Sequence, residues 1–69
     1  MPRPMRRRLV LRALDAAGCT FVREGAEHTV YACPCGEHKT AVPRHTDVTA
    51  GVIGSIIKQL PCLPKGWLQ

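Results

Sequence analysis

The sequence predicts an α+β domain with the element order α-β-β-β-α, on three observations. Near each end of the chain, apolar residues recur with the 3.6-residue period of an amphipathic helix. Between these segments, short runs rich in β-branched and aromatic residues are separated by glycine and proline, as in strands joined by turns. With only 69 residues, the chain can form one small domain around one core.

The first helix is expected to run from about Arg6 to the residue before Gly18. Its apolar stripe, with the spacing i, i+1, i+4, i+5 and i+8, consists of Leu9, Val10, Ala13, Leu14 and Ala17. Gly18 suits the left-handed conformation that often ends a helix. Residues 1–5 hold two prolines and no periodicity, which predicts a disordered arm.

Three strands are expected to follow the first helix. The patterns predict them at 19–24, 28–33 and 38–42. In the first of these, alternation places Phe21 and Arg23 on one side of the strand. A bend at 25–26 and a Pro-Cys-Gly-Glu turn at 34–37 join the strands, and Pro43 ends the third because proline cannot donate to a sheet. Links this short favour an antiparallel meander.

The second helix follows a polar loop at 44–48. Its apolar stripe repeats the spacing of the first and consists of Val52, Ile53, Ile56, Ile57 and Leu60. Gly51 and Gly54 each lower helix propensity by about 1 kcal/mol relative to alanine, but five aliphatic side chains on one face should outweigh them. The helix is therefore expected from about Thr49 to Leu60, where Pro61 disfavours the α conformation.

Two amphipathic helices each need an apolar surface to cover, and the single sheet supplies it. Both should therefore pack on the same face, which leaves the other face and its rim for function. This is the layout of a double-stranded-RNA-binding domain. We expect residues 1–69 to form a single domain, with the disordered arm 1–5 and an irregular tail at 61–69.

The composition indicates an anionic partner. Ten Lys+Arg against five Asp+Glu give a net charge of +5, which suits nucleic acid or an anionic membrane surface, although a merely solvated basic surface is the alternative. No apolar run reaches the roughly 18 residues needed to span a bilayer, and the apolar segment after the basic N-terminus is too short for a signal peptide. We therefore predict a cytoplasmic protein with no membrane partner. A chain this small should have a shallow site and a large, external substrate.

The four cysteines, Cys19, Cys33, Cys35 and Cys62, could form two disulfides in three connectivities. Free thiols are favoured because no secretory signal is present. The segment Cys33-Pro-Cys35-Gly-Glu-His38 could also contribute to a zinc site. However, its C-x-C spacing differs from the usual C-x₂₋₄-C, and Cys62 would have to come from the tail. We prefer a hairpin turn, and we predict no metal or other cofactor.

His28 is the first candidate for chemistry. It follows the bend at Gly25 and starts a strand, which would display its side chain at the rim of the sheet. An imidazole there can take a proton from a ribose 2′-hydroxyl, or as imidazolium give one to a leaving 5′-oxygen, without a metal. Lys39, Arg44 or Lys58 could neutralise the phosphate. An inert surface or hydrogen-bonded histidine is the alternative.

The segment Pro43-Arg44-His45 is the second candidate. It precedes the second helix, whose N-terminus directs backbone N–H groups at any bound phosphate. Arg44 and His45 could hold RNA there. Alternatively, Asp47 and Thr49 only cap the helix and Arg44 is solvated.

Three segments in order resemble the HicA family, the small toxins of bacterial type II toxin–antitoxin modules. They are Arg23-Glu-Gly-Ala-Glu-His28-Thr-Val-Tyr31, Ala41-Val-Pro-Arg-His45, and Gly51 leading into Ile56-Ile-Lys-Gln-Leu60. The resemblance runs from about Arg6 to Leu60. It implies a fold like a double-stranded-RNA-binding domain and an mRNA interferase that cleaves mRNA and inhibits translation. It also implies a HicB-like antitoxin that covers the active site.

The family motif places glycine and then serine or threonine before its catalytic histidine, and tyrosine three positions after it. His28 and Tyr31 match this interval, so the resemblance implies that His28 is catalytic. His45 matches the P-x-H segment and is expected to contact RNA. Ala26 and Glu27 depart from the motif. Glu27 adds a negative charge beside the expected phosphate site, where it could hold an imidazolium in place or weaken RNA binding.

The sequence therefore predicts a metal-independent endoribonuclease toxin in which His28 is the general acid and base. The residues predicted to bind RNA are Arg23, Lys39, Arg44, His45 and Lys58. Those predicted to shape the site are Gly25, Glu27 and Tyr31. The second proton-transfer group is not identified. A non-catalytic RNA-binding module of the same fold is the alternative.

Overall fold

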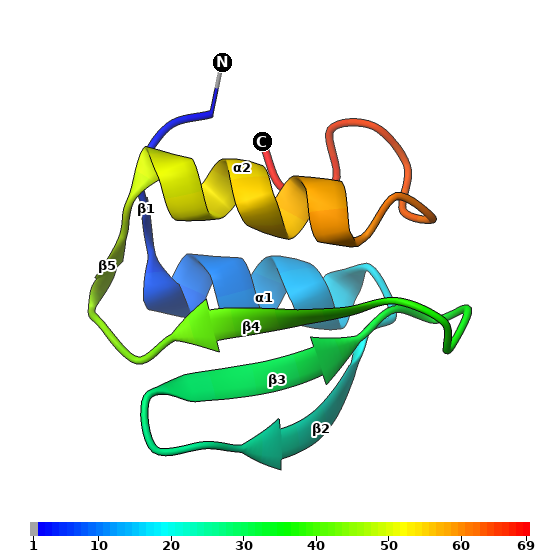
Figure 1. Cartoon of the computed structure of the whole chain (residues 1–69). Coiled ribbons are helices and arrows are strands. Elements are labelled where there is room, and N and C mark those ends of the chain that lie inside the picture. Colours follow the sequence, from blue (N-terminus) through cyan, green and yellow to red (C-terminus); the bar gives the residue numbers. More distant parts are fainter. Residues whose placement is uncertain (1) are drawn as a thin grey trace.

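A computed structural model describes residues 2–69 of the chain (Figure 1). Its elements in order are β1 (Met5–Arg6), α1 (Arg7–Ala16), β2 (Thr20–Glu24), β3 (His28–Ala32), β4 (Lys39–Pro43), β5 (Asp47–Val48) and α2 (Ala50–Gln59). The three longer strands form an antiparallel sheet in the order β2-β3-β4. The α+β class and the predicted order of two helices around a three-stranded meander are confirmed.

The register of the sheet decides which side chains are buried. In β3 and β4, Thr29 lies opposite Val42 and Tyr31 lies opposite Thr40, and all four are buried. His28, opposite Pro43, belongs to the other face. Successive side chains in a strand point to opposite faces, so the sheet has one covered face and one open face, with His28 on the open one.

An irregularity in β2 changes the alternation that the sequence predicts. Phe21 pairs with Tyr31, but Arg23 pairs with Val30, because the register shifts between Phe21 and Arg23. A β-bulge of this kind inserts one extra residue into a strand. The prediction that Phe21 and Arg23 share a side is therefore wrong. Arg23 shares the open face with Val30, and hence with His28.

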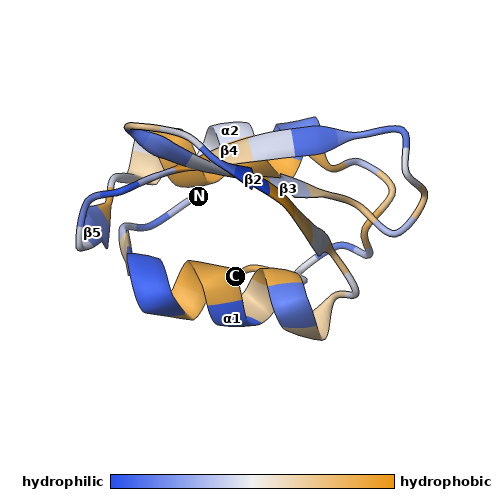
Figure 2. Cartoon of the chain, turned by 90° about the horizontal axis from the view of Figure 1, so that it is seen from below, coloured by the Kyte–Doolittle hydropathy of each residue, from blue (hydrophilic) through white to orange (hydrophobic). Residues whose placement is uncertain are grey.

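Both helices contact the covered face. Arg7 of α1 donates to the Thr29 hydroxyl at 2.6 Å, and the Thr40 hydroxyl donates to the Gln59 side-chain oxygen of α2 at 2.7 Å. Thr29 and Thr40 share that face, so both helices contact side chains of the same face. Figure 2 shows α1 in a layer below the sheet, whereas α2 lies beyond the β4 edge in Figure 1. Both helices have 10 residues, and the described part of the chain has no helix long and apolar enough to span a membrane.

The core lies between the helices and the covered face. Its fully buried side chains are Val10, Leu14, Val42, Val48, Ile53, Ile56 and Leu60. Two members of the predicted stripes lie at its edge, since Leu9 is 38% exposed and Ile57 is 36% exposed. The helix faces that pack are therefore narrower than the apolar periodicity suggests.

The ends of both helices follow local signals. Gly18 has a φ of +88°, which favours glycine, and α1 ends just before it. The Thr49 hydroxyl accepts from the Val52 backbone N–H at 3.4 Å and caps α2. Asp47, the other cap candidate, instead lies in β5, where its carboxylate is 3.6 Å from the Arg6 guanidinium.

The short strands β1 and β5 pair antiparallel between the arm and the loop predicted at 44–48. Met5, expected in the disordered arm, is opposite Val48. Met1 lies outside the described residues. Arg3 and Gln69 exchange two hydrogen bonds, of 2.8 and 2.6 Å, so the arm also contacts the tail. The tail at 61–69 has neither helix nor strand.

Candidate active site

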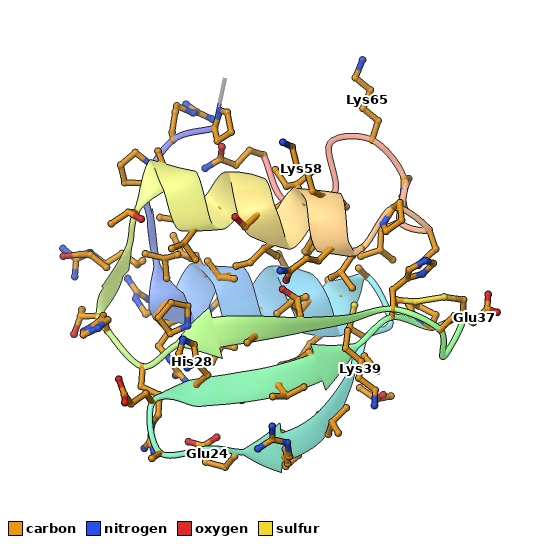
Figure 3. All side chains as sticks on the ribbon, in the orientation of Figure 1. Glu24, His28, Glu37, Lys39, Lys58 and Lys65 are labelled. Atoms are coloured by element: carbon orange, nitrogen blue, oxygen red, sulfur yellow. A yellow bond between two sulfur atoms is a disulfide. The ribbon has the colours of Figure 1, made fainter. Side chains whose placement is uncertain are left out.

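His28 is exposed at the end of the open face, beside the turn that joins β2 to β3 (Figure 3). The Gly25 N–H donates to the His28 carbonyl oxygen at 2.7 Å and closes this turn. A Cβ atom at Gly25 would lie 3.0 Å from that oxygen. Glycine therefore lets the turn approach the His28 backbone closely, which sets where the imidazole is displayed.

Two adjoining hollows surround this turn. The first, of about 360 Å³, is lined by Arg23, residues 25–28, Val30 and Ala41. The second, of about 210 Å³, is lined by Ala26, Glu27, Arg44 and His45. Because both are lined by residues 26 and 27, the structure brings His28 and three of the predicted RNA-binding side chains around one rim. Both hollows are small surface features, as expected for a chain of this length.

A chain of polar contacts lies behind the turn and connects four elements. The Arg7 guanidinium donates to the Thr29 hydroxyl at 2.6 Å, and this hydroxyl donates to the Glu24 carboxylate at 2.9 Å. The other Glu24 oxygen is 3.2 Å from Arg44 Nε. Arg44 also donates to the Gly25 carbonyl oxygen at 3.4 Å. The turn that carries His28 is thus attached to α1 and to the loop after β4.

The members of this chain differ in what they contribute to stability. Glu24 and Arg44 are both more than 40% exposed, and ion pairs in such positions contribute about 0–1 kcal/mol. Thr29 is only 3% exposed, so its hydroxyl depends on Arg7 and Glu24 for hydrogen bonds. Arg7, Thr29 and Glu24 were not predicted as site residues, because no spacing in the sequence relates the first helix to the turn.

We expect Thr29→Val to lower the free energy of unfolding by about 1–3 kcal/mol. The change keeps the shape of the side chain but removes the hydroxyl that accepts from Arg7 and donates to Glu24, so both of these partly buried hydrogen bonds are lost. Urea unfolding followed by circular dichroism measures the effect. The matched control is Thr20→Val in exposed β2, which should stay within about 0.5 kcal/mol of the wild type. Equal effects for the two variants would contradict the role given to Thr29.

Two predicted RNA-binding residues lie away from the rim. Lys39 is the first residue of β4, and Pro43, four residues later, pairs with His28. Lys39 is therefore about 13 Å from His28 along the sheet. Lys58 lies on α2, on the side of the molecule away from His28 in Figure 3. The structure therefore groups Arg23, Arg44 and His45 with His28, but not Lys39 or Lys58.

Arg44 has a structural role that neither interpretation of the sequence included. Its guanidinium contacts Glu24 and Gly25, and its backbone N–H donates to the Glu27 carbonyl oxygen at 3.0 Å. Its side chain thus holds the turn that precedes His28, while 49% of it is exposed to solvent.

Tyr31 supports the sheet from its covered face. It is 8% exposed, and its ring meets that of Phe21 edge-to-face, with centroids 6.1 Å apart. Burial raises the pKa of Tyr31 above its ordinary value of 10.0, and Asp15 adds to this effect while Arg7 opposes it. His28 points to the opposite face, so Tyr31 cannot serve as its partner in proton transfer.

The cysteines lie at the other end of the hairpin formed by β3 and β4. Cys33 and Cys35 form a disulfide, so the prediction of free thiols is wrong for this pair, whereas Cys19 and Cys62 are free. Burial raises the pKa of Cys19, consistent with the core position of this thiol. Cys62, which belongs to the C-terminal tail, lies close to Cys33, Cys35 and His38 at this end of the molecule.

The fold and its rim define a small, basic α+β protein with an open site suited to a large anionic ligand. A family model described as the HicA toxin of bacterial toxin-antitoxin matches residues 7–60, from the start of α1 to the end of α2. The chain belongs to this family. It is therefore the toxin of a toxin–antitoxin system, and its partner is an antitoxin. Comparisons with curated proteins and with solved structures found no match.

Proposed function

We propose that this toxin is a metal-independent endoribonuclease that cleaves mRNA and so inhibits translation, with His28 as its catalytic residue. The observation that carries the proposal is the exposed His28 on the open rim, beside the arginines of the two hollows. Such a rim can admit a polymer that no enclosed pocket of a 69-residue chain could hold. The net charge of +5 favours a polyanion as the substrate.

His28 can perform both proton transfers of RNA cleavage in turn. As a neutral imidazole it takes the proton of a ribose 2′-hydroxyl, and the 2′-oxygen then forms a bond to phosphorus. As the phosphorus–O5′ bond breaks, the imidazolium returns that proton to the leaving oxygen. The products are a 2′,3′-cyclic phosphate and a 5′-hydroxyl. Neither step needs a metal ion, and no second proton-transfer group is required if one histidine acts twice.

The RNA contacts follow from the distances along the open face. Arg23 lines the same hollow as His28 and would neutralise the scissile phosphate. Arg44 and His45 would meet the phosphate on the other side of the turn. Lys39, about 13 Å further along the sheet, would meet RNA two or more nucleotides away. Lys58 would contact only an RNA that continues around to α2.

A HicB-like antitoxin is the proposed partner that covers this rim. The rim is open and carries Arg23 and Arg44, so a cover with acidic side chains opposite these arginines would exclude RNA and pair with them. Expression of the toxin together with the product of the adjacent reading frame tests the pairing. Recovery of a complex that cannot bind RNA is expected. A neighbour that does not bind the toxin would count against this partner.

Induced expression in bacteria separates the ribonuclease from a non-catalytic RNA-binding module. The wild type should arrest growth and produce mRNA fragments with 2′,3′-cyclic phosphate ends, whereas His28→Ala at the same protein level should do neither. A binding module would arrest growth equally in both forms. In vitro, an all-2′-deoxy copy of a cleaved RNA is the matched substrate control, because it lacks the attacking hydroxyl and should remain uncut.

Glu27→Gln should strengthen RNA binding by up to about fivefold at low salt. Glu27 lines both hollows, so its carboxylate repels phosphates bound in either. Fluorescence anisotropy with a labelled RNA measures the affinity. Glu37→Gln is the matched control, since Glu37 lies at the opposite end of the sheet (Figure 3). Unchanged affinity with slower cleavage would show instead that Glu27 holds the imidazolium of His28.

A further inference from the structure

Three cysteines and a histidine converge at the end of the sheet opposite to His28. The ligand atoms of Cys33, Cys35, His38 and Cys62 all lie within 4.8 Å of one another. His38 Nδ1 is 3.2 Å from Cys35 Sγ and 3.6 Å from Cys33 Sγ. We propose that these four side chains, with the thiols reduced, bind one structural Zn²⁺ that fastens the C-terminal tail to the hairpin of β3 and β4.

The donor set suits zinc. Three thiolates and one imidazole form one of the tetrahedral sets found in structural zinc sites, with Zn–S near 2.3 Å and Zn–N near 2.0–2.1 Å. Such a tetrahedron places neighbouring ligand atoms about 3.7 Å apart. The four atoms are already within 4.8 Å, so small side-chain rotations would complete it. Four protein ligands leave no open position for water, which makes the site structural rather than catalytic.

The turn between β3 and β4 holds three of the four ligands, Cys33, Cys35 and His38, near one another. The Cys33 N–H donates to the His38 carbonyl oxygen at 2.9 Å, and the Gly36 N–H donates to the Cys33 carbonyl oxygen at 2.9 Å. Gly36 has a φ of +79°, which a glycine adopts without strain. The Glu37 backbone N–H points at Cys35 Sγ, 3.4 Å away. Hydrogen bonds of this kind hold ligand atoms in place and stabilise a thiolate.

Because Cys62 lies in the tail, a metal bound to it would hold the tail against the hairpin. Beyond Cys62, the tail packs against the core through Leu63, Trp67 and Leu68. A disulfide between Cys33 and Cys35 encloses only three residues and constrains the chain little. Zinc shared with Cys62 would close a loop of about 30 residues, and longer closures restrict the unfolded chain more. Small domains commonly need such a constraint.

One of the four ligands, Cys62, lies in the tail beyond residue 60, where the family match ends. The proposal is also independent of the ribonuclease proposal, since His28 is five residues, or about 17 Å of strand, from Cys33. Formation of the site from the disulfide consumes two electrons and two protons, which a phosphine and water supply as the phosphine becomes its oxide. Zinc then displaces three thiol protons, one from each cysteine.

The full chain, purified with zinc and a phosphine reductant, tests the proposal. Metal analysis should give about one zinc per chain, and Co²⁺ in its place should give the absorption bands of a tetrahedral cobalt thiolate site. Removal of zinc with EDTA should lower Tm by about 10 °C. Cys62→Ser should lose most of the bound metal, and this exposed residue can be replaced without a change in the core.

Three controls separate the possible outcomes. Cys19→Ala removes the one cysteine outside the cluster, His45→Ala removes a histidine from the opposite end of the sheet, and both should keep zinc. His28→Ala should also keep zinc, whatever its effect on RNA. The proposal is overturned if the reduced protein binds much less than one zinc. It is also overturned if Cys62→Ser binds zinc as tightly as the wild type, or if Cys33 and Cys35 stay oxidised in the presence of reductant and zinc.

Discussion

Replacing His28 with alanine is expected to lower the rate of RNA cleavage by about 10²- to 10⁴-fold, the usual contribution of a general acid or base. The loss should appear in the single-turnover rate rather than in RNA affinity, because the arginines around the two hollows remain. The fold should not change, since the side chain is exposed at the end of the sheet. Single-turnover cleavage of a labelled RNA, with the affinity measured separately, checks the prediction.

A chemical rescue makes this test specific to proton transfer. Imidazole added to the buffer should restore part of the activity of His28→Ala, because a free base can enter the open hollow that the side chain leaves. Arg23→Ala is the comparison. It should weaken binding and slow cleavage, but imidazole should not rescue it. A cleavage rate for His28→Ala within about threefold of the wild type would show that His28 is not a catalytic residue.

The second large effect concerns stability. Leu14→Ala is expected to lower the free energy of unfolding by about 2–5 kcal/mol, because Leu14 is fully buried and its removal leaves a cavity against the covered face of the sheet. In a domain of this size each 1 kcal/mol shifts Tm by roughly 4–8 °C. Thermal and urea unfolding followed by circular dichroism measure the change.

Leu9→Ala is the matched control for Leu14→Ala. Both leucines belong to α1 and to the predicted apolar stripe, but Leu9 is 38% exposed. Its truncation should cost less than about 1 kcal/mol, since little apolar surface is returned to water. If the two variants lost equal stability, the position of the core would have to be revised.

Much of the fold could be predicted because its signals are local. The period of the apolar residues placed both helices, Gly18 ended the first and Thr49 capped the second. The glycine and proline turns separated the strands, and the short links made them antiparallel. The sequence also placed His28 at the start of a strand, which is where the structure has it.

Other features escaped prediction because they depend on pairing between distant residues. The two-residue strands β1 and β5 are too short to show a period, and only their mutual hydrogen bonds define them. The bulge in β2 transfers Arg23 to the face of His28, although simple alternation groups it with Phe21. In both cases the backbone contacts, and not the residue types, decide the result.

The sequence by itself determined the α+β class, the order of the elements, the candidate histidine and the family motif around it. Only the tertiary structure decided that Arg7, Thr29 and Glu24 hold the turn before His28, and that Cys62 meets the hairpin cysteines. The physical reason is the range of the interactions. Helix periods, caps and turns involve residues a few positions apart, whereas these polar and cysteine clusters form only once the core has brought distant segments together.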